Sequence, residues 1–286
     1  GGTVEEDLPG TEDNPLGVAS VFHIFAEEAE LDADVNGNVA VADLVDNISF
    51  GTKIHEGLVK KDVSYIQNVT SIAASSFVAD QEDRTNKVIF GKDVQLGTTD
   101  NGNALSVNGT KMDHLKTDEV YQDTDTEQYI DFDKEFEQLN TNSNQLTNET
   151  PAKTVEEADF SDQNNRVIDV SNLTANENNQ IVIDLKSDVL ATNTPLTIKG
   201  LSKSADAPMM VFIVETGGHT YATNSKLAGE YTDGSPRSNH ETEAFSDAHA
   251  LWNFENTPND QEITFNAPVQ GSVLAPNADL TINQNL

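Results

Sequence analysis

The sequence predicts an all-β, mainly β fold with one long flanking helix. Most of the chain consists of short runs rich in β-branched and aromatic residues, each bounded by Gly, Asn or Asp, which is typical of strands. One stretch, residues 125–149, instead repeats its apolar residues at helical spacing. The chain of 286 residues is long enough to bury a core without disulfides, and it contains no cysteine.

The first sixteen residues are polar and carry two prolines, so we expect residues 1–16 to be a linker and residues 17–286 a single domain. Strand-like runs then follow one another: VASVFHIFAEEAEL, NVAVADL, NISFGTKI, VSYIQNVTSI, NKVIFGKDVQL and ALSVNG. Asn-Gly pairs at residues 36–37, 101–102 and 108–109 predict tight turns.

Residues 125–149 are predicted to form the helix. Asp125 can cap it, acidic residues crowd its first turns, and Pro151 follows its end. The predicted apolar face, at steps of three or four residues, consists of Tyr129, Phe132, Phe136, Leu139, Ser143 and Leu146. We expect this face to lie against the β-structure.

Strands resume after the helix. The run MMVFIV, Met209–Val214, is apolar without alternation and predicts a strand buried on both sides. Residues 217–248 are polar and predict a long loop, a candidate functional segment. Periodicity does not separate a sandwich, a jelly roll and a solenoid. The short strands 270–274 and 279–282, joined by a Pro-Asn corner, favour the rungs of a parallel β-helix.

Charge restricts the partners. The chain has 49 acidic and 16 basic residues, a formal net charge of −33, which opposes nucleic acid and membrane insertion and favours cations and basic proteins. No run of eighteen apolar residues occurs, so no membrane span is predicted. The ends carry no signal peptide and no sorting motif, and we expect the chain to be a piece of a longer protein.

The stretch ELDADVNGNVAVADL has two interpretations. Asp32, Asp34, Asn36, Gly37 and Asp43 approach the spacing of a twelve-residue calcium loop. The downstream half is β-branched and strand-like, however, and a calcium loop of this type needs a helix there. A structural corner at Asn36-Gly37 is favoured. If Ca²⁺ binds, the ligands are Asp32, Asp34 and Asn36, with Asp43 too far along the next strand.

Catalytic patterns are missing. There is no cysteine and no nucleophile elbow, and the histidines of the long loop, His219, His240 and His249, lack zincin spacing. No catalytic, cofactor-binding or metal residue is therefore assigned, and an enzyme is not expected. Trp252 and Phe254 favour core packing over an exposed binding pair. Lysines in strand-like runs are candidates for an internal cross-link, although the sequence does not single one out: Lys87, Lys186 and Lys199.

Several stretches together resemble a known family: NPLGVASVFHIFAEEAELDADVNGNVAVADL, VSYIQNV, YIDFDKEFEQLNTNSNQL, ALWNFENT and GSVLAPNADLTINQNL. In order and coverage they are similar to the bacterial choice-of-anchor A family, also described as a collagen-binding adhesive domain. The resemblance implies a secreted Gram-positive surface protein, anchored to the cell wall through a C-terminal region beyond residue 286. It also implies a right-handed parallel β-solenoid (β-helix), similar to ice-binding proteins, with a flanking helix.

The function expected from this resemblance is a non-enzymatic, monomeric adhesin domain that binds a host extracellular-matrix protein, a glycan or another surface ligand. The alternative is a stalk module without a ligand of its own. Ice binding is less favoured because the threonines are irregularly spaced. A β-helix enzyme acting on polysaccharides is also less favoured, because no catalytic constellation is present.

Overall fold

The computed structural model describes residues 2–7, 22–32, 39–47, 61–77, 85–102, 104–204, 206–218, 220–236, 250–255, 261–267, 272–275 and 278–283. The fold of these residues is mostly β, as predicted. Among them only α2, Phe132–Asn148, is a long helix; α1, Val4–Asp7, and α3, Ser187–Ala191, are about one turn each.

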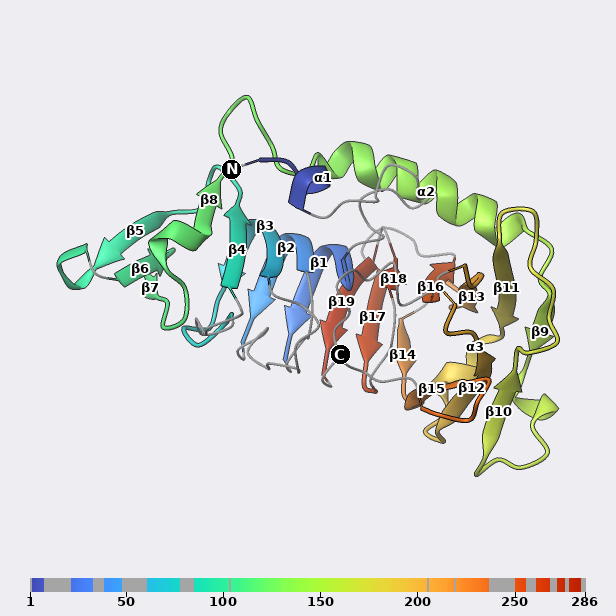
Figure 1. The fold of residues 1–286 in the computed structure, drawn as a ribbon. Helices are drawn as coiled ribbons and strands as arrows, with labels where there is room; N and C mark the ends of the chain where they lie inside the picture. The colour runs from blue at the N-terminus through green and yellow to red at the C-terminus, as the bar shows by residue number, and fades with distance from the viewer. Residues whose placement is uncertain are drawn as a thin grey trace.

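Parallel pairing builds the largest sheet, which has thirteen strands (Figure 1). Its main path runs in the order β8-β4-β3-β2-β1-β18-β16-β13-β11-β9. In chain order these strands are β1 (Ile24–Leu31), β2 (Val39–Asp46), β3 (Lys61–Ser71), β4 (Thr85–Phe90), β8 (Val120–Gln122), β9 (Lys153–Val155), β11 (Gln180–Leu185), β13 (Met209–Glu215), β16 (Ala250–Glu255) and β18 (Ser272–Leu274).

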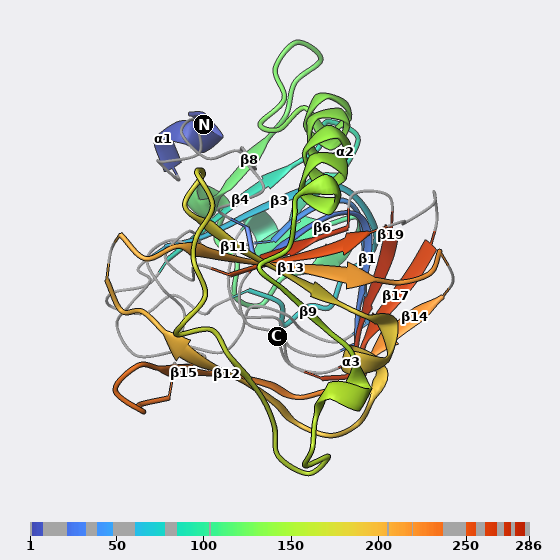
Figure 2. The ribbon, with the colours of Figure 1, turned by 90° about the vertical axis from the view of Figure 1, so that its right-hand side faces the viewer.

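Two further groups of strands give the second half of the molecule three faces (Figure 2). One group joins the large sheet at β1 and contains β14 (Tyr221–Thr223), β17 (Gln261–Phe265) and β19 (Ala278–Ile282). The other is a separate parallel sheet of β10 (Arg166–Asp169), β12 (Leu196–Leu201) and β15 (Leu227–Tyr231). β1 spans two faces, because its first residues pair with β18 and its last with β19.

The strands are not stacked in chain order. β1 lies in the middle of the sheet, between β2 on one side and the C-terminal strands β18 and β19 on the other. From β1 the chain proceeds outward to β8, α2 then runs back along the sheet, and the strands from β9 onward return toward β1 (Figure 1). The first and last strands of the domain therefore hold its two halves together.

Two hydrophobic cores stabilise this arrangement. One fills the space enclosed by the sheets, and the other lies between the large sheet and α2. β13 contributes to both, with Met210 and Phe212 on the enclosed side and Val211 and Ile213 on the helix side. A strand that is apolar on both faces needs no alternation, so the prediction for residues 209–214 is confirmed.

The helix has the predicted face but a later start. Phe132, Phe136, Leu139, Ser143 and Leu146 are the buried residues of α2, as expected. The start at residue 125 was wrong. The cap is Asp131, whose carboxylate accepts the backbone N–H of residue 134. The preceding residues are held in a loop, where the N–H of residue 129 donates to the carboxylate of residue 123 at 2.9 Å.

The Asn-Gly turns are confirmed where the structure describes them. Asn101 and Asn108 have φ angles of 60° and 48° and are each followed by a glycine at positive φ, as tight hairpin turns require. They join the antiparallel strands β5 (Leu96–Thr99), β6 (Ala104–Val107) and β7 (Thr110–Lys111). Asn36-Gly37 lies outside the described residues. The strands on either side of it, β1 and β2, pair in parallel and so do not form a hairpin.

The prediction of one long loop over residues 217–248 was wrong in part. β14 and β15 both lie within it. These strands have three and five residues, too few for a periodic signal, and they exist because β17 and β12 offer them pairing partners. His219 and His240, together with residues 237–249, lie outside the described residues.

Candidate functional site

A row of acidic side chains crosses four neighbouring strands. The register places Glu262 of β17 beside Asp279 of β19, Asp279 beside Glu28 of β1, and Glu28 beside Asp43 of β2. We call these four residues the acidic row. The residue that follows each of them in its strand is buried, as Leu280 is after Asp279, so the row faces outward. The sequence shows no such cluster, because its members come from both ends of the chain.

The acidic row has an electrostatic cost. Adjacent strands are spaced by about 4.8 Å, and like charges directly opposite each other on a sheet are destabilising. Thr70 of β3 compensates in part, because its hydroxyl donates to the Asp43 carboxylate at 2.8 Å. The core under α2 contains residues of β1, β2, β3, β11 and β13 but none of β17 or β19, which lie on another face (Figure 2). The acidic row therefore gathers negative charge on a part of the sheet that α2 does not cover.

A ladder of polar side chains follows the same strands one position beyond their ends. The Asn283 amide donates to Asn266, and the Asn266 amide donates to Asn224, both at 3.0 Å. Asp32 and Asn47 occupy the equivalent position after β1 and β2, and Asn47 donates to the Asp32 carboxylate at 3.1 Å. Asp32, a candidate calcium ligand, thus takes part in the polar ladder just after the end of β1. The other candidates, Asp34 and Asn36, lie outside the described residues.

A second group of carboxylates lies where β11, β13 and β16 end. Glu215 and Glu255 are register partners, and Lys186 Nζ is 2.8 Å from Glu215 Oε2 and 3.8 Å from Asp184 Oδ2. Burial, together with the charges of Glu215 and Asp184, raises the pKa of Glu255 to about 6. Burial and the charge of Glu215 likewise raise the pKa of Asp184. The hydrogen bond that Lys186 donates to Glu215 raises the pKa of Lys186.

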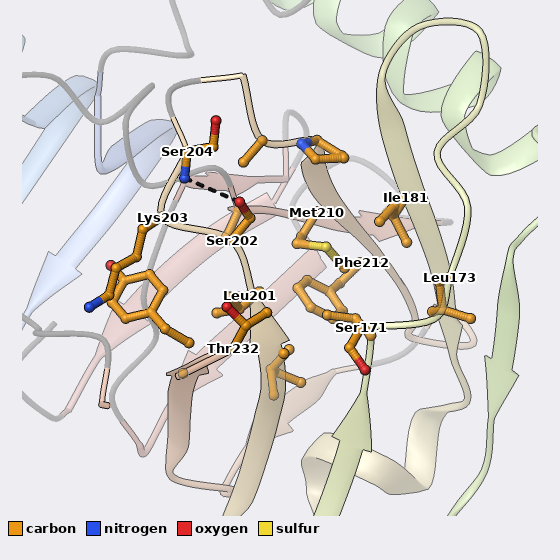
Figure 3. A pocket seen from close by; sticks show the side chains of 18 of the residues that line it. Ser171, Leu173, Ile181, Leu201, Ser202, Lys203, Ser204, Met210, Phe212 and Thr232 are labelled. Carbon is orange, nitrogen blue, oxygen red and sulfur yellow. Dashed lines mark hydrogen bonds between the residues drawn. The ribbon is translucent and has the colours of Figure 1, made fainter. Parts of the chain in front are cut away.

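A cavity of about 550 Å³ lies between the β10-β12-β15 sheet and the start of β11, β13 and β16. Figure 3 shows Met210 and Phe212 of β13 beside it, with Ser202 on another side. Trp252 stacks on Phe212 with ring centroids 4.1 Å apart, and both rings are almost fully buried. Phe254 is buried too, so the prediction that Trp252 and Phe254 pack in the core is confirmed.

The structure also places the three lysines. Lys87 is buried, with its ammonium against the Asp7 carboxylate at 2.5 Å, while Lys199 is exposed on β12 and Lys186 belongs to the carboxylate group above. The loop histidines lie outside the described residues. Within the described residues, no three His, Asp or Glu side chains form a group that could hold a metal ion. None of the described helices is long and apolar enough to cross a membrane.

Comparison with known proteins identifies one family. A family model described as "Putative Ice-binding-like adhesive domain" matches residues 15–286, nearly the whole chain. No curated protein and no solved structure matches.

Proposed function

The chain belongs to this family of ice-binding-like adhesive domains, and from that premise we propose that it is a non-enzymatic adhesin. Its proposed contact surface is the acidic row on the open face of β17, β19, β1 and β2. The proposed ligand is a basic patch of a host extracellular-matrix protein or of another surface molecule.

One observation carries this proposal. The four carboxylates of the acidic row lie side by side on adjacent strands, although Glu28 and Asp279 are far apart in the sequence. A purely structural sheet gains nothing from such an arrangement, since like charges opposite each other destabilise it. A basic partner that binds across the row brings positive charge to carboxylates that lie next to one another, which favours its binding. With a net charge of −33, the protein also attracts basic partners over longer distances.

We further propose that the parallel strands wind into a right-handed β-solenoid of the ice-binding type. Parallel ladders on each of the three faces support this proposal. An adhesive domain is consistent with a cell-surface location. Secretion by a Gram-positive bacterium, and wall anchoring through a further C-terminal region, are part of the proposal and follow from the sequence resemblance.

The second candidate is a stalk module that only holds another domain away from the surface. The polar ladder from Asn224 through Asn266 to Asn283 favours this reading, because it stabilises the corners between coils without contributing to a binding face. The two candidates differ in one measurable property, the binding of a ligand by the isolated domain.

The test is binding of the purified domain to immobilised collagen, fibronectin, fibrinogen and a glycan array. The adhesin proposal expects retention by at least one of them, falling as salt rises from low to physiological ionic strength. A double variant of the acidic row, Asp43→Asn with Glu262→Gln, is expected to bind roughly tenfold more weakly at low salt. The matched control neutralises two exposed carboxylates elsewhere, Glu137→Gln with Glu177→Gln, and is expected to bind like the parent.

Each other outcome has a clear meaning. Failure of every ligand to retain the domain favours the stalk. An equal loss in the control variant means that total charge matters and that the acidic row does not form the site. Turnover of a polysaccharide on the array contradicts a non-enzymatic function.

A further inference from the structure

Two local features of the sequence contribute to the cavity beside Trp252. The register aligns Ile168 of β10, Ile198 of β12 and Gly229 of β15. The first two side chains fill the enclosed core, whereas the third position has no side chain. In addition, the register of β12 and β15 shifts at Gly200, whose φ is +86°. The absent side chain and the shifted register therefore both widen the space at this corner of the interior.

The walls of this cavity are mainly aliphatic. Ile181, Ile198, Met210 and Leu227 line it, and the stacked pair of Phe212 and Trp252 forms a further wall. The volume of about 550 Å³ lies within the range of small-ligand pockets, roughly 300–1,000 Å³. An aliphatic space of this size favours an apolar body over a sugar or an ion.

The exposed loop after β12 supplies the polar part. The Ser202 hydroxyl accepts the N–H of Ser204 at 3.1 Å, which leaves its own hydrogen to donate (Figure 3). Lys203 is paired with Asp233 at 2.8 Å and lies over the Tyr231 ring. The hydrogen bond from Lys203 lowers the pKa of Asp233, so this pair stays ionised and its charges compensate each other. The polar side thus suits a neutral head group with an oxygen acceptor.

We propose that this cavity binds a single medium-length acyl chain with a neutral, hydroxyl-bearing head group, such as a monoacylglycerol. The acyl chain lies between Ile198 and Trp252, and an oxygen of the head group accepts a hydrogen bond from the Ser202 hydroxyl. The proposal is independent of the adhesive function, because the acidic row lies on another face.

Trp252 makes a direct test possible, because it is the only tryptophan of the chain. The probe is monodecanoylglycerol, used below the concentration at which it aggregates, with and without bromine at the end of its acyl chain. Bromine quenches indole fluorescence on contact. We expect the brominated probe to cause saturable loss of Trp252 emission, the plain probe to raise the melting temperature, and decanoate, with its charged head, to bind more weakly.

Variants make the test specific. Gly229→Val adds an isopropyl group beside Ile198, where the acyl chain is proposed to lie, and is expected to weaken quenching while circular dichroism stays unchanged. Ser202→Ala, at an exposed position where folding is not at risk, is expected to weaken binding. The control, Ala222→Val on β14, adds a β-branched side chain away from the cavity and is expected to bind normally. Emission that does not change with the brominated probe, or quenching in Gly229→Val that is as strong as in the parent, would overturn the proposal.

Discussion

At the scale of single residues, burial and neighbouring charge decide how Glu255 ionises. It ends β16 next to Glu215 on β13, and the charge of Asp184 also acts on it. The folded state therefore holds a proton on Glu255 more tightly than the unfolded state does, since the pKa rises from 4.5 to about 6. Stability consequently falls as the pH rises through this interval and stays at the lower level above it.

The corresponding prediction concerns Glu255→Gln, which keeps the side chain neutral at every pH. Above pH 7 we expect the variant to be more stable than the parent by on the order of 1 kcal/mol, once solvent screening is allowed for. At pH 4 the two should be nearly equal, because Glu255 is then protonated. Urea unfolding at both pH values measures the difference, with Glu177→Gln as an exposed control. An equal effect at both pH values would show that ionisation is not the cause.

At the scale of elements, the helix α2 shows how a local cap competes with periodicity. The apolar spacing predicted its buried face correctly, but the first predicted turn, which begins at Asp125, is not helical. The loop bond between residues 129 and 123 holds that turn away from the helix, and Asp131 provides the cap instead. Both aspartates precede helix-compatible sequence, so the loop hydrogen bond, which periodicity does not reveal, distinguishes them.

Two alanine variants test this assignment. Asp131→Ala should lower the free energy of unfolding by about 1 kcal/mol, because the N–H of residue 134 loses its acceptor. Asp125→Ala should change it by less than about 0.5 kcal/mol, since its ion pair with Lys92, at 3.4 Å, is exposed. Denaturant unfolding of both proteins gives the comparison. A larger effect for Asp125 would mean that the helix begins where the periodicity alone predicted.

At the scale of the whole molecule, β1 joins the two halves. It pairs with β2 on one side and with β18 and β19 on the other, and α2 packs against strands from both halves. Neither half completes its sheet alone, because each would leave β1 or its partner as an unpaired edge. We therefore expect the domain to unfold in one cooperative transition.

Tyr65 and Trp252 allow this to be measured, because they lie in different halves. Tyr65→Ala removes a fully buried ring from β3 and should cost about 3–5 kcal/mol. If the domain is cooperative, the melting temperature reported by Trp252 fluorescence falls as far as that reported by circular dichroism. Val167→Ala, at a 37% exposed position, is the control and should change neither. If the melting temperature reported by Trp252 fluorescence does not change in Tyr65→Ala, the two halves unfold separately.

Local sequence by itself determined the features that depend on neighbours in the chain. These are the β class, the buried face of α2, the turns at Asn101 and Asn108, and the strand at residues 209–214. Each leaves a periodic or turn signal within a few residues. The order of the motifs also indicated an adhesive domain, which the family match confirms, whereas membership of the choice-of-anchor A family and collagen binding stay predictions.

Only the tertiary structure decided which strands lie side by side, and through this the acidic row and the cavity. Glu28 and Asp279 are at opposite ends of the chain, and Gly229 leaves a space only because its register partner is Ile198. Such features arise from pairings between distant segments, which local periodicity does not encode. For the same reason the sequence did not show that Asp32, part of a calcium-like spacing, lies beside Asn47, where β1 and β2 end.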